Sequence, residues 1–230
     1  MFSMGKYAAK NRDDNDKNVH YDIKYIGSIE VDCDFKEKAD LELNFAKAIE
    51  DMVYDGRDEF IPPLSYRKGS TGSESVKNPK DLRMTGLLDY KEKMLSQKNI
   101  LAITDDGEVI AFASFKHDYE DRDYLPLAEC DDKINYLTTI IVNSAYRRNG
   151  IANKLYDYLE NKLPESVHGN IVATRTWWTE GNGHLALLDR REYVLTCTLH
   201  NEREFLGEKY DTVYYCKRVE RKQLSSRRTH

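Results

Sequence analysis

The chain has 230 residues, with 35 basic and 40 acidic side chains and a formal net charge of −5 at pH 7. This length suits one domain with tails, and the negative charge disfavours a nucleic-acid partner. No apolar run reaches the roughly 18 residues of a membrane-spanning helix, and the N-terminus lacks the apolar core of a signal peptide. The cysteines are too far apart for a zinc site, so we expect no metal, reduced thiols and a cytoplasmic location: Cys33, Cys130, Cys197 and Cys216.

The first third of the chain alternates between predicted elements and segments rich in turn residues. We expect a disordered N-terminal segment over residues 1–20 and a strand over residues 25–31. Apolar residues recur at helical spacing over residues 41–54, which predicts a helix. Two prolines at positions 62 and 63 exclude a helix there, residues 70–79 form a predicted Gly/Ser loop, and a second helix is predicted over residues 87–97.

A hairpin and an acidic insertion come next. The strand predicted over residues 99–104 meets its partner over residues 109–115 through Asp105-Asp106-Gly107, a strong turn sequence. Residues 118–133 then hold seven acids against Arg122 and Lys133. Such an acidic rim would attract a cationic amine. The alternative is a solvated loop that keeps the chain soluble.

The most informative stretch is a buried strand followed by a glycine turn and a helix. The β-branched run over residues 136–142 predicts the strand, residues 143–146 connect it, and the helix that opens at Arg147 ends near Leu163, before Pro164. A helix N-terminus directs free N–H groups and the positive end of its dipole to one point. Gly150 lets the backbone approach a ligand closely. The stretch therefore predicts a site for a phosphate-bearing cofactor.

The last third completes the sheet. We expect a strand over residues 170–177 and a helix from Asn182 or Gly183 to Arg191. Strands over residues 193–200 and 211–216 follow. The basic segment from Lys217 is expected to be flexible, so we divide the chain into a folded domain over residues 21–218 and a tail over residues 219–230.

The residues Arg147, Gly150 and Ala152 form an R-x-x-G-x-A pattern. It resembles the pyrophosphate-binding signature of the GNAT family, the Gcn5-related N-acetyltransferases, and the order of predicted elements over residues 22–218 is also similar to that family. The resemblance implies an α/β (α+β) fold with a mixed, mostly antiparallel sheet of about seven strands and about four helices. It also implies that parallel strands four and five splay apart around the cofactor.

The resemblance further implies transfer of an acetyl group from acetyl-CoA, bound as a co-substrate, to a primary amine of a small molecule or peptide. Backbone groups of the central strand would bind pantetheine or polarise the thioester, the glycine turn would bind pyrophosphate, and Asn182 would contact the pantetheine arm. Glu192-Tyr193 stands where family members often have Gly-Phe. The residues expected to bind the cofactor are Ile140, Ile141, Val142, Arg147, Arg148, Asn149, Gly150, Ile151, Ala152 and Asn182.

Catalytic and acceptor residues are less specified. Many family members carry a glutamate on the fourth strand and a tyrosine on the fourth helix, but this strand has no acid and the helix position corresponds to Leu188. His184 is a candidate titrating group near the thioester, and its alternative is a capping or surface histidine. The candidates for acceptor contacts are Tyr66, Arg67, His117 and Asp118.

Two hypotheses follow from these features. The first is an active N-acetyltransferase, monomeric or homodimeric. The second is a GNAT-fold protein without catalysis that acts by partner binding or CoA sensing. The absent strand acid and helix tyrosine favour the second, and the intact anion-binding turn favours the first.

Overall fold

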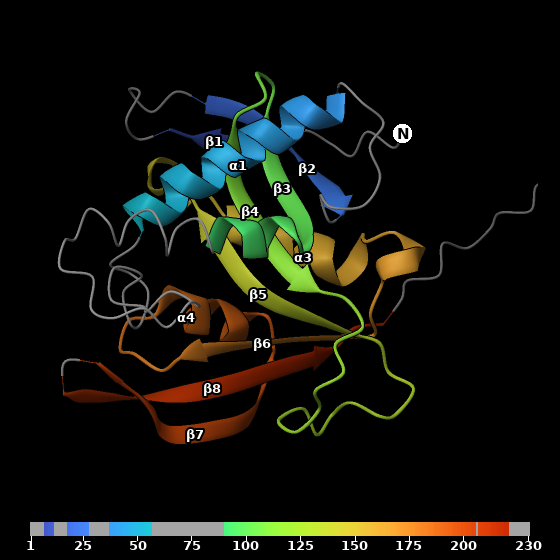
Figure 1. The fold of residues 1–230 in the computed structure, drawn as a ribbon, viewed down its shortest axis with the longest axis vertical. Helices are drawn as coiled ribbons and strands as arrows, with labels where there is room; N and C mark the ends of the chain where they lie inside the picture. The colour runs from blue at the N-terminus through green and yellow to red at the C-terminus, as the bar shows by residue number, and fades with distance from the viewer. Residues whose placement is uncertain (1–6, 12–17, 28–36, 57–89, 206, 221–230) are drawn as a thin grey trace, which may run out of the picture.

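The computed structural model describes residues 7–11, 18–27, 37–56, 90–205 and 207–220. They form one eight-stranded sheet in the order β1-β2-β3-β4-β5-β6-β8-β7, in which only β5 and β6 pair in parallel. The described part thus has the predicted mixed, mostly antiparallel sheet, with one strand more than expected (Figure 1). The strands are β1 (Tyr7–Lys10), β2 (Asn18–Gly27), β3 (Lys98–Thr104), β4 (Val109–Lys116), β5 (Ile134–Val142), β6 (Ile171–Trp177), β7 (Val194–Phe205) and β8 (Glu208–Arg218).

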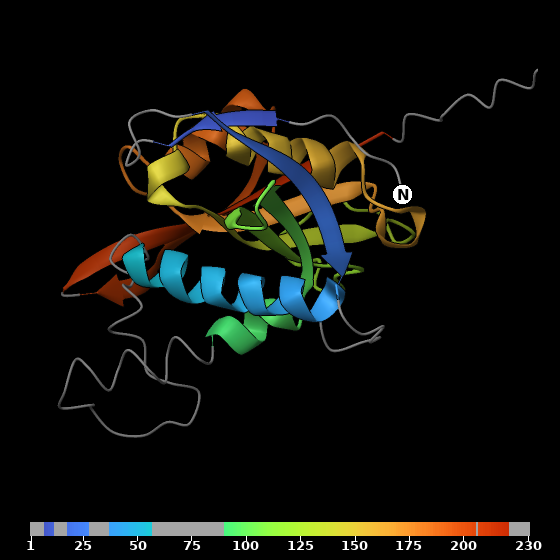
Figure 2. The same cartoon turned by 90° about the horizontal axis from the view of Figure 1, so that it is seen from above.

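Helices cover both faces of the sheet. Figure 2 shows α1 (Glu37–Asp55) on one face, together with the helical residues 90–95, and α3 (Ile151–Asn161) with α4 (Gly183–Arg190) on the other. We call these the α1 face and the α3 face. Short 3-10 turns at Ser144–Tyr146 and Glu165–Val167 flank α3.

The packing follows the predicted apolar stripes. On α1, Phe45, Ile49 and Met52 are buried against β3 and β4, with the rings of Phe45 and Phe112 5.3 Å apart. On α3, Ile151, Leu155 and Leu159 are fully buried against the opposite face. Each helix therefore buries one face of the sheet, as helical periodicity predicts.

The N-terminal region differs from the sequence-based expectation. β1 lies within the segment 1–20 that was expected to be disordered, and β2 covers residues 18–27 where a strand over 25–31 was predicted. β1 forms because it pairs with β2, Tyr7 opposite Tyr21, a contact that local sequence does not reveal. The rings of this pair are 5.4 Å apart.

Several predictions fall outside the described residues. These are the proline pair at 62 and 63, the Gly/Ser loop at 70–79, the first three residues of the helix over 87–97 and most of the tail. The domain boundaries at residues 21 and 218 stay predictions.

Candidate functional site

The parallel strands β5 and β6 separate halfway along their length. Their pairing runs from Ile134 opposite Ile171 to Leu137 opposite Thr174 and ends there. The hydroxyl of Thr174 donates to the carbonyl of Leu137 at 3.0 Å and closes the paired region. Beyond it, β5 continues beside β4 and β6 continues beside β8, which leaves a V-shaped opening between the two strands.

A β-bulge lies where the V begins. Ser114 pairs with Thr139 and Phe115 with Leu137, so Thr138 is an extra residue in β5. An extra residue reverses the alternation of side chains beyond it. As a result, Tyr136 lies on the α1 face together with Ile141, whereas Leu137 and Ile140 lie on the α3 face.

The bulged strand presents backbone amides to the V. The amide of Asn143 donates to Ile110 in β4 at 2.9 Å. Because successive amides along a strand point to opposite sides, the amide of Ile141 also points to β4. The amides of Ile140 and Val142 point into the V. Of the three amides proposed to contact the cofactor, two therefore have the required direction.

The N-terminus of α3 has no side-chain cap. Gly150 takes the N-cap position with φ +74° and supplies no side-chain cap. A Cβ built on it would meet no atom within 4 Å. By contrast, Asn182 caps α4 by accepting from the amides of His184 at 2.9 Å and Leu185 at 3.4 Å. The first amides of α3 therefore lack a protein cap and face open space, as an anion-binding helix end requires.

The two arginines and the asparagine of this turn have different positions. Arg147 donates from Nε to the carbonyl of Val142 at 3.1 Å, which ties the turn to the end of β5. Arg148 is exposed, with φ +69°. Asn149 instead binds β1: its Oδ1 accepts from the amide of Lys10 at 3.1 Å, and its Nδ2 donates to the carbonyl of Lys10 at 3.0 Å. The side chain of Asn149 therefore holds the turn in place and does not face the cavity.

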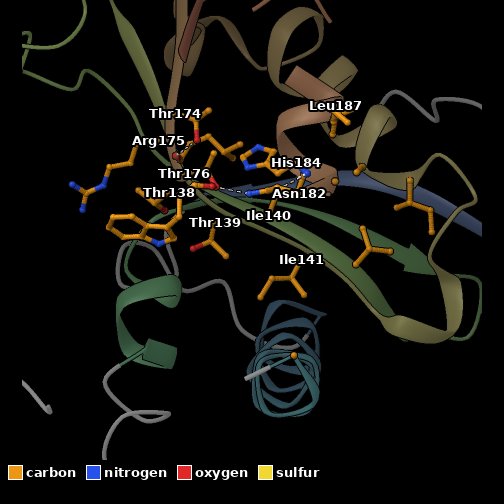
Figure 3. A pocket seen from close by; sticks show the side chains of 18 of the residues that line it. Thr138, Thr139, Ile140, Ile141, Thr174, Arg175, Thr176, Asn182, His184 and Leu187 are labelled. Atoms are coloured by element: carbon orange, nitrogen blue, oxygen red, sulfur yellow. Dashed lines mark hydrogen bonds between the residues drawn. The ribbon is translucent and has the colours of Figure 1, made fainter. Parts of the chain in front are cut away.

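One cavity of about 980 Å³ joins the V to the end of α3. Its lining comes from both faces of the sheet: Met52, Tyr90 and Met94 on the α1 face, Ile151 and Leu187 on the α3 face. It therefore passes through the sheet at the V. Figure 3 shows Asn182 and His184 beside Ile140, with Ile141 pointing toward α1. The predicted cofactor residues that line the cavity are Ile140, Ile141, Val142, Arg147, Arg148, Gly150, Ile151, Ala152 and Asn182.

His184 lines the same cavity from the first turn of α4. Its Nε2 forms a hydrogen bond of 2.7 Å with the hydroxyl of Tyr156, which is buried in α3. Burial lowers the pKa of His184 to about 4. At neutral pH the ring is therefore uncharged, and it acts as a hydrogen-bonding group.

The position expected for a helix tyrosine is closed to the cavity. Leu188 is fully buried in the core, and the neighbouring Leu187 lines the cavity. Glu192, which stands where the family has glycine, has φ +62°, the left-handed conformation that glycine favours. The backbone of the Gly-Phe turn is thus kept although the glycine is absent.

The predicted acceptor residues do not gather at the cavity. Tyr66 and Arg67 lie outside the described residues. His117 binds Asn135 through Nδ1 at 2.8 Å, and Asp118, with φ +55°, begins the insertion; neither lines the cavity. The neighbouring Lys116 does. Three further lining residues were not predicted from the sequence: Tyr119, Tyr136 and Arg175. Of these, Arg175 could have been noticed, because it is a charged residue inside a predicted strand.

The described residues contain no group of three or more His, Cys, Asp and Glu side chains that could hold a metal ion. In the same part of the chain, no helix has both the length and the apolar character needed to cross a bilayer.

Comparisons with known proteins agree with this architecture. NAA60 of Arabidopsis thaliana, solved with a bisubstrate analogue, superposes with a TM-score of 0.51 at 16% identity, over 86% of this chain and 99% of that one. A protein of Acinetobacter baylyi ADP1 described as an acetyltransferase superposes with a TM-score of 0.52 at 12% identity, over 86% and 94% of the two chains. At these identities the likeness shows the fold.

Comparison with curated protein sequences gave no significant match. The family model of the acetyltransferase (GNAT) family matches residues 71–186, which include the V, the bulge and the α3 turn. That match spans half of the chain and contains the R-x-x-G-x-A pattern. The chain therefore belongs to the GNAT acetyltransferase family.

Proposed function

We propose that this protein transfers an acetyl group from acetyl-CoA to a primary amine of a small molecule or peptide by direct attack. The observation that carries the proposal is the single cavity that connects the uncapped N-terminus of α3 with the V between β5 and β6. One end suits a phosphate group and the other lets an amine reach the same space from the α1 face. We also propose a cytoplasmic location and a monomer or homodimer.

The residues present fit acetyl-CoA. The amides at the start of α3, beside Arg147 and Arg148, would bind the pyrophosphate. The amides of Ile140 and Val142 would bind the pantetheine or the thioester oxygen. Acetyl-CoA supplies the activated acetyl group, and the protein supplies its position relative to the amine.

Few groups are available to move protons. When the amine attacks, its nitrogen bonds to the thioester carbon, the carbon–sulfur bond breaks, and the amine must lose a proton. Glu180 is the single carboxylate among the described residues that line the cavity. We propose that the amine loses its proton to water, and that neutral His184 donates a hydrogen bond from Nδ1 to the leaving sulfur while Tyr156 holds Nε2. A thiol with a pKa of about 8.5 needs little further help to leave.

The second hypothesis, partner binding or CoA sensing without catalysis, is supported by the absence of the two side chains that many family members carry. Leu188 is buried in the core, and no acid of β5 lines the cavity. An enzyme and a CoA sensor both require CoA to bind, so turnover separates these two. An absence of CoA binding would instead favour partner binding alone.

The test begins with thermal unfolding in acetyl-CoA and in CoA. A ligand at 100 times its Kd stabilises by roughly 2.7 kcal/mol, which is a shift of a few degrees for a domain of this size. Gly150→Glu should abolish the shift, because the carboxylate would occupy the anion site. Gly207→Glu is the matched control: Gly207 also has positive φ and open space around it, but lies in the β7–β8 hairpin outside the cavity.

No shift in the wild type would refute the proposal. A shift followed by thiol release with an amine acceptor would support the enzyme. A shift without thiol release across polyamines, amino acids, aminoglycosides and peptides would favour the CoA-sensing alternative.

A further inference from the structure

Two cations and two tyrosines form a cluster among the residues that line the cavity on the α1 face. Lys116 in β4 lies opposite Tyr136 in β5, and Tyr136 lies opposite Ala173 in β6. Arg175 follows two residues after Ala173, on the same face of β6. The ring of Tyr119 stacks on Tyr136 with centroids 4.3 Å apart, and the Lys116 Nζ lies 5.9 Å from the Tyr119 ring. These four side chains, which we call the α1-face cluster, all line the cavity.

The two cations are not neutralised by a described partner. Neither Lys116 nor Arg175 forms an ion pair with any residue that the structure describes. Arg175 donates to the hydroxyl of Tyr214 at 3.4 Å. Glu202 acts on Arg175 electrostatically and accepts a hydrogen bond from the hydroxyl of Thr212. The cluster thus presents two positive charges to the cavity, and the carboxylate of Glu202 is not among the residues that line it.

No acid of the insertion forms an ion pair with Lys116 or Arg175, although Asp121 lies close enough to act electrostatically on Tyr119 and Tyr136. None of its seven acids lines the cavity. Asp132 binds Arg218 with its two oxygens, at 3.0 and 2.7 Å, and so fastens the insertion to β8. Asp121 accepts from the hydroxyl of Tyr119 at 3.3 Å. The positions of these acids give no support to the expected acidic rim for a cationic amine.

Resting on the proposed function, we infer that the acceptor carries an anionic group close to its amine, and that Lys116 and Arg175 bind this group. The phosphates of acetyl-CoA would occupy the other end of the cavity, at α3, so they do not compete for these cations. The stacked rings of Tyr119 and Tyr136 would form one wall beside the bound acceptor. A carboxylate and a phosphate share this chemistry, and Arg binds both with paired hydrogen bonds.

The experiment measures thiol release from acetyl-CoA with matched acceptors. A set of α-amino acids is compared with their C-terminal amides, phosphoethanolamine with ethanolamine, and spermidine represents a cationic amine. The variants are Lys116→Gln, Arg175→Gln and the charge reversal Lys116→Glu. Lys209→Gln is the control, because Lys209 is an exposed lysine of β8 outside the cavity. Thermal shift with acetyl-CoA is recorded for every sample.

We expect the anionic acceptors to exceed their neutral counterparts in kcat/KM by about tenfold or more, the usual range for a charge-assisted hydrogen bond. Lys116→Gln and Arg175→Gln should raise the KM of those acceptors by about tenfold and leave the acetyl-CoA shift unchanged. Lys116→Glu should reverse the preference toward spermidine, and Lys209→Gln should behave as the wild type. A larger kcat/KM ratio for the amino acids over their amides would indicate a carboxylate acceptor. A larger ratio for phosphoethanolamine over ethanolamine would indicate a phosphate acceptor.

Two results would overturn the inference while leaving the proposed function intact. One is an intact acetyl-CoA shift with spermidine or neutral amines used as well as the anionic ones. The other is an unchanged KM in both Gln variants. Absence of the acetyl-CoA shift in the wild type would instead refute the proposed function, and the inference with it.

Discussion

Acid should destabilise this protein through His184, because the folded chain holds its ring in a neutral, partly buried state. Burial lowers its pKa to about 4 from an ordinary value of 6.5. Below pH 6.5 this histidine therefore binds a proton in the unfolded chain but stays neutral in the folded chain until the pH approaches 4. The stability from this group is complete above pH 6.5 and is lost as the pH falls toward 4. At pH 4.5 the loss is about 2 kcal/mol, allowing for the part of the ring that reaches the cavity.

The perturbation that isolates this term is His184→Gln, which keeps a polar partner for Tyr156 but does not titrate. The free energy of unfolding in urea is measured for both proteins at pH 7.5 and 4.5 by the fluorescence of Trp177 and Trp178. The difference between the two pH values gives the acid-induced loss of stability for each protein. Carboxylates titrate in both proteins and cancel. The wild type should lose about 2 kcal/mol more than the variant between the two pH values. His20→Gln, at an exposed histidine of β2, is the control and should follow the wild type. An equal acid loss in wild type and His184→Gln would refute the reasoning.

Three further changes test the packing around the site. Glu192→Gly should raise the free energy of unfolding by about 0.5 kcal/mol, because glycine removes the cost of the left-handed backbone and that gain exceeds the loss from the higher entropy of the unfolded chain; a lower Tm would contradict it. Tyr156→Phe should cost about 1 kcal/mol, the worth of its hydrogen bond to His184, and a double-mutant cycle with His184→Ala, which removes the partner of Tyr156, should show that the two losses are not additive. Arg191→Met should cost roughly 2–4 kcal/mol in urea unfolding, since it removes an ion pair of 2.9 Å from buried Glu160; a neutral result would show that Lys217 alone compensates.

Local sequence was enough to predict the central strand, the glycine turn and the helix that follows it. Residues 136–142 form β5 nearly as predicted, and the Gly150 turn opens α3 because glycine accepts φ +74° at the N-cap without cost. Regular hydrophobic periodicity also predicted α1, and the turn sequence Asp105-Asp106-Gly107 predicted the β3–β4 hairpin. These features depend on neighbours within a few residues, which is the range over which a sequence pattern carries information.

Other features depend on residues far apart in the chain. β1 exists because β2 pairs with it, and the bulge at Thr138 is visible only in the register between β4 and β5. That bulge moves Tyr136 to the α1 face, where it meets Tyr119 from the insertion.

The sequence by itself determined the family, the glycine turn that opens α3 and the absence of an acid on the central strand. Tertiary structure decided which side chains share the cavity. His184 reaches it and is held by Tyr156 from another helix, whereas Asn149, in the predicted turn, binds Lys10 of β1. It also placed Lys116 and Arg175 in the lining of the cavity and left the seven acids of the insertion outside that lining. The physical reason is that helix and turn geometry follow from adjacent residues, while the direction of a charge depends on the register of strands distant in sequence.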